Sequence, residues 1–266
     1  MRTTFAAKYG PWALVTGASK GLGAEFCRQL AAKGLNLVMV ASHEDALMGQ
    51  SADIEREYGV KTQPVTLDLG SDGFMARLAP LTADLDIGLL VSNAAVSDVG
   101  PFLQATPAYL TRQLRVNSLA GVLLARHYGA LMTQRQRGGI ILMSSGSAQH
   151  GTPFSANYAA TKAFNLILAE SLWYEFKPRG VDVLGVLAGA TRTEGWLANS
   201  PKPDALVPVM GTAPVVASSL RALGRRPSVA PGVINRLGYA AMGLMTRQRA
   251  VKTLGASMNK MFGPFD

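Results

Sequence analysis

Two residues in the second half of the chain could together move a proton. Tyr158 and Lys162 are four positions apart in a segment whose pattern predicts a helix, so their side chains would share one face. A free tyrosine has a pKa of about 10 and is a poor base at neutral pH. A nearby ammonium group favours the phenolate and lowers that pKa, so Tyr158 could protonate a carbonyl oxygen or deprotonate an alcohol.

A serine precedes this pair where it could hold the same oxygen. Ser145 stands at the end of a predicted strand, and its hydroxyl could hydrogen-bond the reacting oxygen and fix its position. The adjacent Ser144 is the competing candidate. A serine hydrolase is the natural rival interpretation, but Ser144-Ser145-Gly146 is not the G-x-S-x-G turn that such enzymes use.

A glycine-rich turn follows the first apolar run. Gly17, Gly21 and Gly23 permit a tight turn and a close approach of the backbone to a pyrophosphate, and the free N–H groups of the next helix would face that anion. The spacing differs from the G-x-G-x-x-G fingerprint, but the mechanics are the same. The turn predicts a phosphate-bearing cofactor, with an ordinary glycine-rich turn as the alternative.

Short apolar runs alternate with helical patterns, and this alternation would position the chemical groups. Strands are predicted over residues 12–16, 35–41, 61–67, 87–92, 139–144 and 181–187, with 229–234 as a candidate seventh. Helices are predicted over 22–33, 45–58, 73–81, 107–135, 156–176 and 214–223. Continuous apolar strands between helices predict an α/β fold, a Rossmann-type doubly wound parallel sheet of six to seven strands in a single domain.

Jointly, these motifs resemble those of the short-chain dehydrogenase/reductase family, in its short single-domain branch. The run from Thr16 to Gly23 matches the cofactor turn of that family, and Ser92-Asn93-Ala94-Ala95 resembles its Asn-Asn-Ala-Gly motif, with Ala95 in place of glycine. Four residues match the catalytic tetrad in order and spacing: Asn117, Ser145, Tyr158 and Lys162. The stretch 188–193 resembles the Pro-Gly motif, with Ala188 in place of proline.

The resemblance extends from about residue 11 to residue 234, and the segment 8–17 is locally similar to 3-oxoacyl-CoA reductase and 17β-hydroxysteroid dehydrogenase members. It implies hydride transfer between a nicotinamide cofactor and a ketone or secondary alcohol. Tyr158 would be the acid/base and Ser145 the carbonyl anchor. Lys162 would lower the tyrosine pKa and contact the ribose, and Asn117 would hold a water linked to Lys162. The alternative is a catalytically silent cofactor-binding regulatory or scaffold protein, which would not need the whole tetrad.

The sequence favours NADP(H) over NAD(H). NAD-selective members carry an acid at the end of the second strand for the ribose 2′-hydroxyl, whereas this chain has Ala41 and Ser42 there. Lys20 could pair with a 2′-phosphate, although it could equally be a solvated surface lysine. The expected cofactor contacts, with Asp68 at the adenine, are Gly17, Ser19, Lys20, Gly21, Leu22, Gly23, Ser42, Asp68, Leu69, Asn93, Ala94, Tyr158, Lys162, Gly189, Thr191 and Thr193.

The segment 193–212 is predicted to close over the nicotinamide as a substrate lid. Its apolar residues suggest an apolar substrate, such as an acyl or steroid-like carbonyl compound, although a core contact would have the same composition. These residues are Trp196, Leu197, Leu206, Val207, Val209 and Met210.

Composition limits the class of protein. The 266 residues are 48% hydrophobic and 16% charged, which excludes a disordered chain. The single cysteine, Cys27, excludes an intrachain disulfide, and the three histidines lack metal-ligand spacing, so no metal is expected. No apolar run reaches the ~18 residues of a membrane span and no secretory signal opens the chain, so a cytoplasmic location is expected.

The net charge of +9 is concentrated towards the C-terminus, because the segment from Ala205 onward contains eight Lys and Arg residues and one acidic residue. We divide the chain into a dinucleotide-binding and catalytic domain, 1–234, and a basic amphipathic helical extension, 235–266. The extension is interpreted first as packing on its own domain or as an oligomer contact, in a homodimer or homotetramer. A cover over the substrate mouth and peripheral membrane contact are the alternatives. Nucleic acid is not expected, because no recognition motif accompanies the charge.

Overall fold

The protein folds around a parallel sheet, described here by a computed structural model that covers residues 4–194, 196, 209–263 and 265. Within these residues the sheet has seven strands in the order β3-β2-β1-β4-β5-β6-β7. The strands are β1 (Trp12–Thr16), β2 (Asn36–Ala41), β3 (Thr62–Thr66), β4 (Ile87–Ser92), β5 (Gly138–Ser145), β6 (Val181–Ala188) and β7 (Ser228–Val229). The order reverses between β1 and β4, which confirms the doubly wound α/β fold predicted from the sequence.

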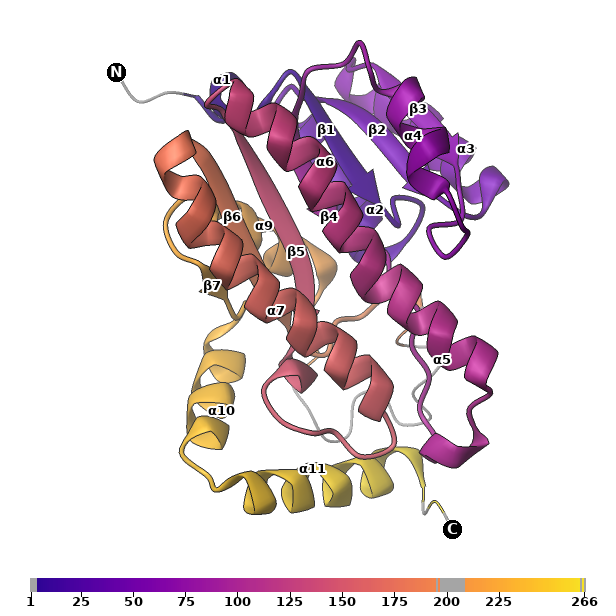
Figure 1. Cartoon of the computed structure of the whole chain (residues 1–266), viewed down its shortest axis with the longest axis vertical. Helices are drawn as coiled ribbons and strands as arrows, with labels where there is room; N and C mark the ends of the chain where they lie inside the picture. The colour runs from indigo at the N-terminus through magenta and orange to yellow at the C-terminus, as the bar shows by residue number, and fades with distance from the viewer. Residues whose placement is uncertain (1–3, 195, 197–208, 264, 266) are drawn as a thin grey trace.

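Helices cover both faces of the sheet (Figure 1). They are α1 (Phe5–Tyr9), α2 (Gly21–Ala31), α3 (Glu44–Tyr58), α4 (Phe74–Leu81), α5 (Pro107–Leu114), α6 (Ala120–Gln134), α7 (Ala156–Phe176), α9 (Thr212–Ala222), α10 (Val233–Gly243) and α11 (Arg247–Phe262). Alternate strand residues point into two cores: Val15 joins α2 and α9 on one face, whereas Leu14 joins α6 and α7 on the other. Because both faces are buried, the strands appear in the sequence as continuous apolar runs.

Two predicted elements differ from the structure. The candidate strand 229–234 is wrong in extent, because β7 ends at Val229 and α10 begins at Val233. Pro231 cannot donate a backbone hydrogen bond, and Gly232 adopts a left-handed conformation (φ +87°), so the run cannot continue as a strand. The predicted helix 107–135 contains a π-helical segment, Arg115–Leu119, between α5 and α6.

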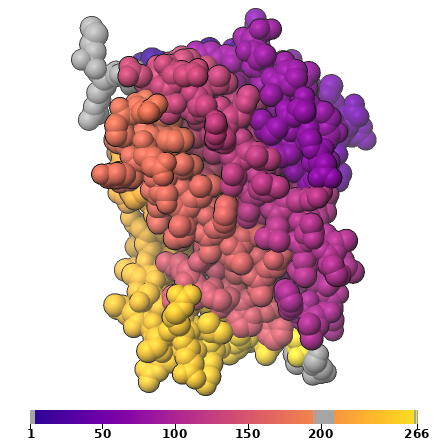
Figure 2. All heavy atoms as spheres, in the orientation of Figure 1, coloured from indigo at the N-terminus to yellow at the C-terminus, as the bar shows by residue number. Residues whose placement is uncertain are grey.

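The C-terminal helices lie across one end of the molecule. In Figure 1, α10 descends from β7, and α11 runs below the loop after β5 and the first turns of α7. The Phe265 ring stacks on Phe154 of that loop, with ring centroids 4.3 Å apart. Figure 2 shows these helices forming the lower end of the surface. Among the residues that the structure describes, none of the helices has the length and apolar character needed to span a membrane.

A buried carboxylate lies at the amino end of β6, at the end of the strand away from the active-site residues. Asp182, at the start of β6, is 3% exposed. The Tyr9 hydroxyl donates a 2.7 Å hydrogen bond to it, Lys177 Nζ lies 3.3 Å from it, and Lys8 pairs with it as well. Burial alone would raise the pKa of Asp182, but the contacts from Lys8 and Tyr9 outweigh burial and lower it. This cluster joins α1 and the end of α7 to the sheet.

Candidate active site

The glycine turn joins the carboxyl end of β1 to α2. Gly17 and Gly21 have φ angles of +65° and +55°, a left-handed conformation that favours glycine. A Cβ atom at Gly23 would lie 1.9 Å from the carbonyl oxygen of Gly17, so this position has no room for a side chain. Lys20 precedes the helix without capping it through its side chain, which leaves the first amide groups of α2 available. These residues fit a dinucleotide pyrophosphate at a helix N-terminus. Ser19 and Leu22 lie in the same turn, both half-buried.

A threonine connects this turn to the segment after β4, the strand beside β1 in the sheet. The Thr16 hydroxyl oxygen accepts hydrogen bonds from the backbone N–H groups of Asn93 (3.0 Å) and Ala94 (3.1 Å). The Asn93 side-chain amide donates to the Thr16 carbonyl at 3.0 Å. The predicted contacts Asn93 and Ala94 therefore lie beside the glycine turn. Thr16 was not among the expected site residues, although its place directly before Gly17 is the signal that could have identified it.

Ser145, Tyr158 and Lys162 come together where β5 ends and α7 begins. Burial raises the pKa of Tyr158, and a side-chain hydrogen bond with Ser145 opposes that rise without outweighing it. The sequence pattern predicts the opposite direction, because it does not show how far the phenol is removed from water. The Ser144 hydroxyl donates to the Lys162 carbonyl oxygen at 2.7 Å. Ser144 thus fastens β5 to α7, and Ser145 is the serine that reaches Tyr158.

Lys162 is buried beneath the tyrosine. Its side-chain nitrogen lies 5.5 Å from the centre of the Tyr158 ring and donates a 3.2 Å hydrogen bond to the Met143 carbonyl. The residue is 3% exposed. Burial lowers the pKa of Lys162 to about 8. The ammonium group is therefore close to the phenol in a poorly solvated environment.

Asn117 lies in the π-helical segment and braces the loop after β4. Its side chain accepts from the Val96 N–H at 2.8 Å, and it donates to the Val96 carbonyl at 2.9 Å and to the Thr161 hydroxyl at 3.1 Å. Asn165 of α7 donates to the Asn117 carbonyl at 2.7 Å and to the Met143 carbonyl at 3.2 Å. Asn117 is therefore linked to Lys162 through Asn165 and the Met143 carbonyl, and the water-linked relay stays a prediction. Asn165, three residues after Lys162, was missed from the sequence.

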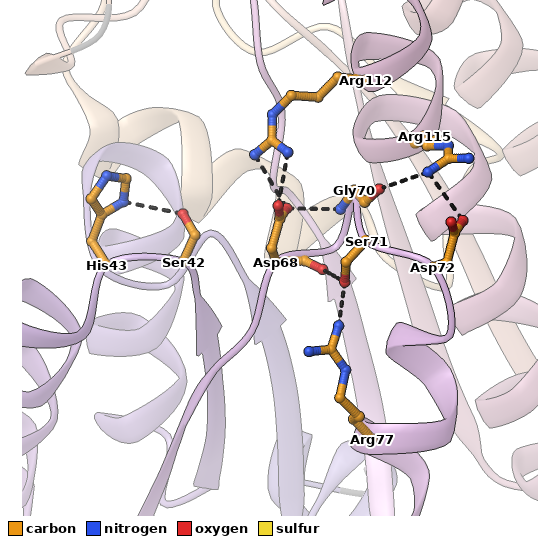
Figure 3. Close-up of polar contacts among 9 residues, drawn as sticks. All are labelled: Ser42, His43, Asp68, Gly70, Ser71, Asp72, Arg77, Arg112 and Arg115. Carbon is orange, nitrogen blue, oxygen red and sulfur yellow. Dashed lines mark hydrogen bonds and ion pairs between the residues drawn. The ribbon is translucent and has the colours of Figure 1, made fainter. Parts of the chain in front are cut away.

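The predicted adenine contact is engaged in an ion pair (Figure 3). Arg112 of α5 donates to the two carboxylate oxygens of Asp68 at 2.8 and 3.2 Å, and the Gly70 N–H donates to the same group at 2.9 Å. The Arg112 guanidinium lowers the pKa of Asp68. The adjacent Leu69 is buried. An adenine contact through Asp68 stays a prediction and would have to coexist with Arg112, which the sequence did not indicate.

The residues expected around a 2′-phosphate are exposed. The Ser42 hydroxyl lies 3.1 Å from Nδ1 of His43, at the end of β2 (Figure 3). Lys20 forms an ion pair with Glu194, with Nζ and the carboxylate 3.1 Å apart. A Cβ atom at Gly21 would lie 3.1 Å from the Thr193 side chain. The segment after β6 therefore lies against the glycine turn.

Both ends of the predicted lid can be placed. Thr191 and Met210 form a parallel bridge, in which the Arg192 N–H donates to the Met210 carbonyl at 2.8 Å. Trp196 and Val209 are also described, whereas the predicted lid residues Leu197, Leu206 and Val207 lie outside the described residues. The two lid ends therefore meet beside the carboxyl end of β6.

A pocket of about 190 Å³ opens beside Ser145. Its floor is formed by the chain directly after β5 and β6, and its far wall by α10 and α11. Its lining includes Ser145, Gly146, Gly189, Tyr239, Met242 and Leu254. Gly189 was expected to contact the cofactor, and here the side chain of Asn235 lies against it, 2.5 Å from where a Cβ would be.

The fold and this arrangement of groups define a dinucleotide-dependent oxidoreductase. The model of the family described as short chain dehydrogenase matches residues 11–203, and the chain belongs to this family. It is therefore a NAD(P)-dependent enzyme that acts on CH–OH and C=O groups.

Relatives of established activity include steroid and acyl enzymes. The 7β-hydroxysteroid dehydrogenase of Clostridium sardiniense is 31% identical over 97% of this chain and 99% of its own length. The very-long-chain 3-oxoacyl-CoA reductase of Pyricularia oryzae is 36% identical over 76% of this chain and 62% of its own length.

Solved structures give the same picture of the fold. A 7β-hydroxysteroid dehydrogenase structure superposes with a TM-score of 0.89 at 28% identity, covering 94% of this chain and 99% of that one. A short-chain dehydrogenase from Sphingobium yanoikuyae in complex with NADPH has a TM-score of 0.76 at 31% identity, covering 89% and 95%.

Proposed function

We propose that this protein is an NADP(H)-dependent oxidoreductase that interconverts a bulky apolar ketone and its secondary alcohol. The observation that carries the proposal is the meeting of Ser145, Tyr158 and Lys162 beside a pocket that Ser145 lines together with Met242 and Leu254. A catalytically silent cofactor-binding protein would not need a hydrogen-bonded serine and tyrosine above a buried lysine.

The geometry supports a division of labour among the three residues. The hydroxyls of Ser145 and Tyr158 both face the position of one substrate oxygen and hold it by hydrogen bonds. In the reductive direction Tyr158 donates its proton to that oxygen as negative charge develops there. Lys162, beneath the ring, stabilises the phenolate that remains. The nicotinamide cofactor supplies or accepts the hydride when bound.

The choice between steroid and acyl substrates favours the steroid class. The steroid relative from Clostridium sardiniense aligns over 97% of this chain, a share that leaves little of the C-terminal helices out. It also aligns over 99% of its own length, whereas the very-long-chain 3-oxoacyl-CoA reductases, some of which cover up to 91% of this chain, align over 54% to 72% of theirs. Because α10 and α11 line the pocket, similarity that includes them bears on the substrate.

The preference for NADP(H) is supported by charge at the expected phosphate position. Ala41 and Ser42 provide no carboxylate to repel a 2′-phosphate, and Lys20 lies at the start of α2. The relative from Sphingobium yanoikuyae was solved with NADPH. Lys20 would have to exchange Glu194 for the phosphate, which is feasible because both side chains are more than half exposed.

The test is a substrate panel followed by NADPH absorbance. It contains 7-ketosteroids, long-chain 3-oxoacyl thioesters and bulky diaryl ketones, with the matching alcohols tested in reverse with NADP⁺. We expect the highest kcat/KM on a ketosteroid. Tyr158→Phe should reduce turnover by about 10³-fold and leave the Kd for NADPH within twofold. NADPH binding without turnover of any member would instead identify the silent cofactor-binding protein.

We further propose a homodimer or homotetramer in the cytoplasm. Phe164 and Ile167 of α7 are 47% and 61% exposed, which supports an apolar contact between copies, and the reduced Cys27 suits a reducing compartment. Light scattering would give the oligomeric state, and a monomer would contradict the proposal. Peripheral membrane contact through 235–266 is the less favoured alternative, and co-sedimentation with anionic liposomes would detect it.

A further inference from the structure

The helix α10 presents one side to the pocket and the other to solvent. Asn235, Tyr239 and Met242 recur at helical spacing and are half-buried, whereas Leu237 and Leu244 are 66% and 90% exposed. Tyr239 and Met242 line the pocket beside Ser145, and Leu254 of α11 joins them. The C-terminal extension therefore supplies the wall that faces the catalytic residues.

Two glycines allow α10 to approach the sheet closely. A Cβ atom at Gly146, directly after Ser145, would lie 2.0 Å from the Tyr239 hydroxyl. A Cβ atom at Gly189 would lie 2.5 Å from the side-chain nitrogen of Asn235. Asn235 is held in turn by a 2.9 Å hydrogen bond to the Pro231 carbonyl. The hydroxyl of Tyr239 is thus fixed directly above the residue that follows the carbonyl anchor.

The phenol of Tyr239 is a proton-bearing group at neutral pH. Burial and the nearby Tyr158 together raise the pKa of Tyr239 to about 12. Tyr239 and Ser145 line the same pocket, which places the Tyr239 phenol next to the proposed catalytic groups. Tyr239 is therefore a neutral hydrogen-bond donor beside the reacting groups. The hydroxyl of Ser147, also in this pocket, is buried without a hydrogen-bond partner among the described residues.

We infer that Tyr239 is a positioning residue, which binds a polar group of the substrate and holds the substrate beside Ser145 and Tyr158. This inference rests on the proposed function and adds a residue to it from outside the tetrad. The substrate it fits has an apolar body, which contacts Met242 and Leu254, and a polar group beside the reacting oxygen. Tyr158 remains the proton donor, so Tyr239 acts on how the substrate sits and not on the proton transfer itself.

The central test separates binding from chemistry in Tyr239→Phe, which keeps the ring and removes the hydroxyl. On the best ketone of the panel we expect KM to rise about tenfold, as for the loss of one hydrogen bond, with kcat within threefold and the Kd for NADPH unchanged. Tyr174→Phe is the matched control, because Tyr174 is 78% exposed on α7, and it should match the wild type. An unchanged KM in both Tyr239→Phe and Tyr239→Ala would overturn the inference.

A second test of the inference substitutes Gly146, the residue against which the Tyr239 hydroxyl lies. Gly146→Ala would displace Tyr239, so it should raise KM as Tyr239→Ala does, and the double variant Gly146→Ala/Tyr239→Ala should be no worse than either single change. Additive losses in KM would mean that the two residues act independently and would contradict the inference.

Failure of the proposed function has a different signature. If no ketone is turned over by the wild type, calorimetry with a 7-ketosteroid and NADPH-loaded protein still measures ligand binding in the presence and absence of the Tyr239 hydroxyl. Weaker ketosteroid binding to Tyr239→Phe would support the positioning role even then, and equal binding would overturn it.

Discussion

Lys162 and Asp182 are both buried charged residues, 3% exposed; Lys162 of α7 contacts the carboxyl-terminal half of β5, whereas Asp182 lies at the amino end of β6. Asp182 receives contacts from a tyrosine and two lysines, which together lower its pKa. Lys162 donates to a backbone carbonyl and has no carboxylate partner among the described residues, and burial lowers its pKa to about 8. The charge of Asp182 is neutralised within the fold, whereas that of Lys162 is left for a phenolate and a cofactor.

The difference separates residues that hold the fold together from residues that serve chemistry. A buried carboxylate with several partners joins elements that are distant in sequence, and removing it leaves those partners uncompensated. A buried ammonium without a counterion costs stability, and such perturbed groups are typical of active sites. Variants at the two positions should therefore affect different measurements.

The largest effect is expected from Lys162→Met. It should lower kcat by about 10²-fold or more, because Tyr158 loses the charge that stabilises its phenolate. The midpoint of urea unfolding should stay equal or rise, because the variant removes a buried charge that lacks a counterion. A variant that unfolds much more readily would show that Lys162 also holds the fold together.

Asp182→Asn should lower the stability of the fold and leave kcat unchanged, the reverse of Lys162→Met. We expect the free energy of unfolding to fall by about 2 kcal/mol, since the buried Tyr9 hydroxyl loses a charged acceptor, whereas Lys8 and Lys177, 40% and 49% exposed, regain water. The kcat of the folded fraction should match that of the wild type, because Asp182 and Ser145 lie at opposite ends of the paired strands β5 and β6. Urea titration and initial rates, measured on one preparation, test both expectations.

The pH dependence of stability should also differ between the two sites. The lowered pKa of Asp182 means that its contribution is present above the ordinary value of 3.8 and is lost as pH falls through the folded-state value. Between about 8 and 10.5 the folded chain holds fewer protons on Lys162 than the unfolded chain, so stability from this group rises with pH. Unfolding free energies of the wild type minus each variant should rise with pH at both sites, in an acidic range for Asp182 and in an alkaline range for Lys162. A flat difference at either site would contradict its assignment.

The smallest effect is expected at an exposed charge. Lys20→Ala should weaken NADPH binding about fivefold and leave NADH binding unchanged, since Lys20 is 57% exposed and its charge is partly screened. Glu194→Gln should tighten NADPH binding slightly, because it frees Lys20. Fluorescence titration measures each Kd, with Lys33→Ala on the far end of α2 as the control. Equal affinity of the wild type for the two cofactors would remove the proposed preference.

The sequence predicted what depends on local pattern and missed what depends on distant contact. The strands from β1 to β6 were placed to within a residue or two, because buried parallel strands are apolar on both faces. The seventh strand was predicted too long, since the apolar run 229–234 contains Pro231 and Gly232, which prevent β7 from continuing.

The pairings Tyr9–Asp182 and Gly146–Tyr239 could not be predicted, because nothing near either residue in the sequence indicates its partner. The direction of the Tyr158 pKa was also missed, since burial is a property of the packed molecule.

The π-helical segment at 115–119 lets this helix hold one residue more than a regular α-helix without losing its alignment. A π turn contains about one residue more than an α turn, so the extra residue does not rotate α6 relative to α5, whereas an extra residue in a regular α-helix would rotate everything after it by about 100°. Tyr128, fully buried and bonded to Thr82 at 2.8 Å, therefore keeps its place in the core. The same wide turn carries Asn117, whose side chain accepts from the Val96 N–H. One surplus residue is thus placed at the site without changing the rotational phase of the core.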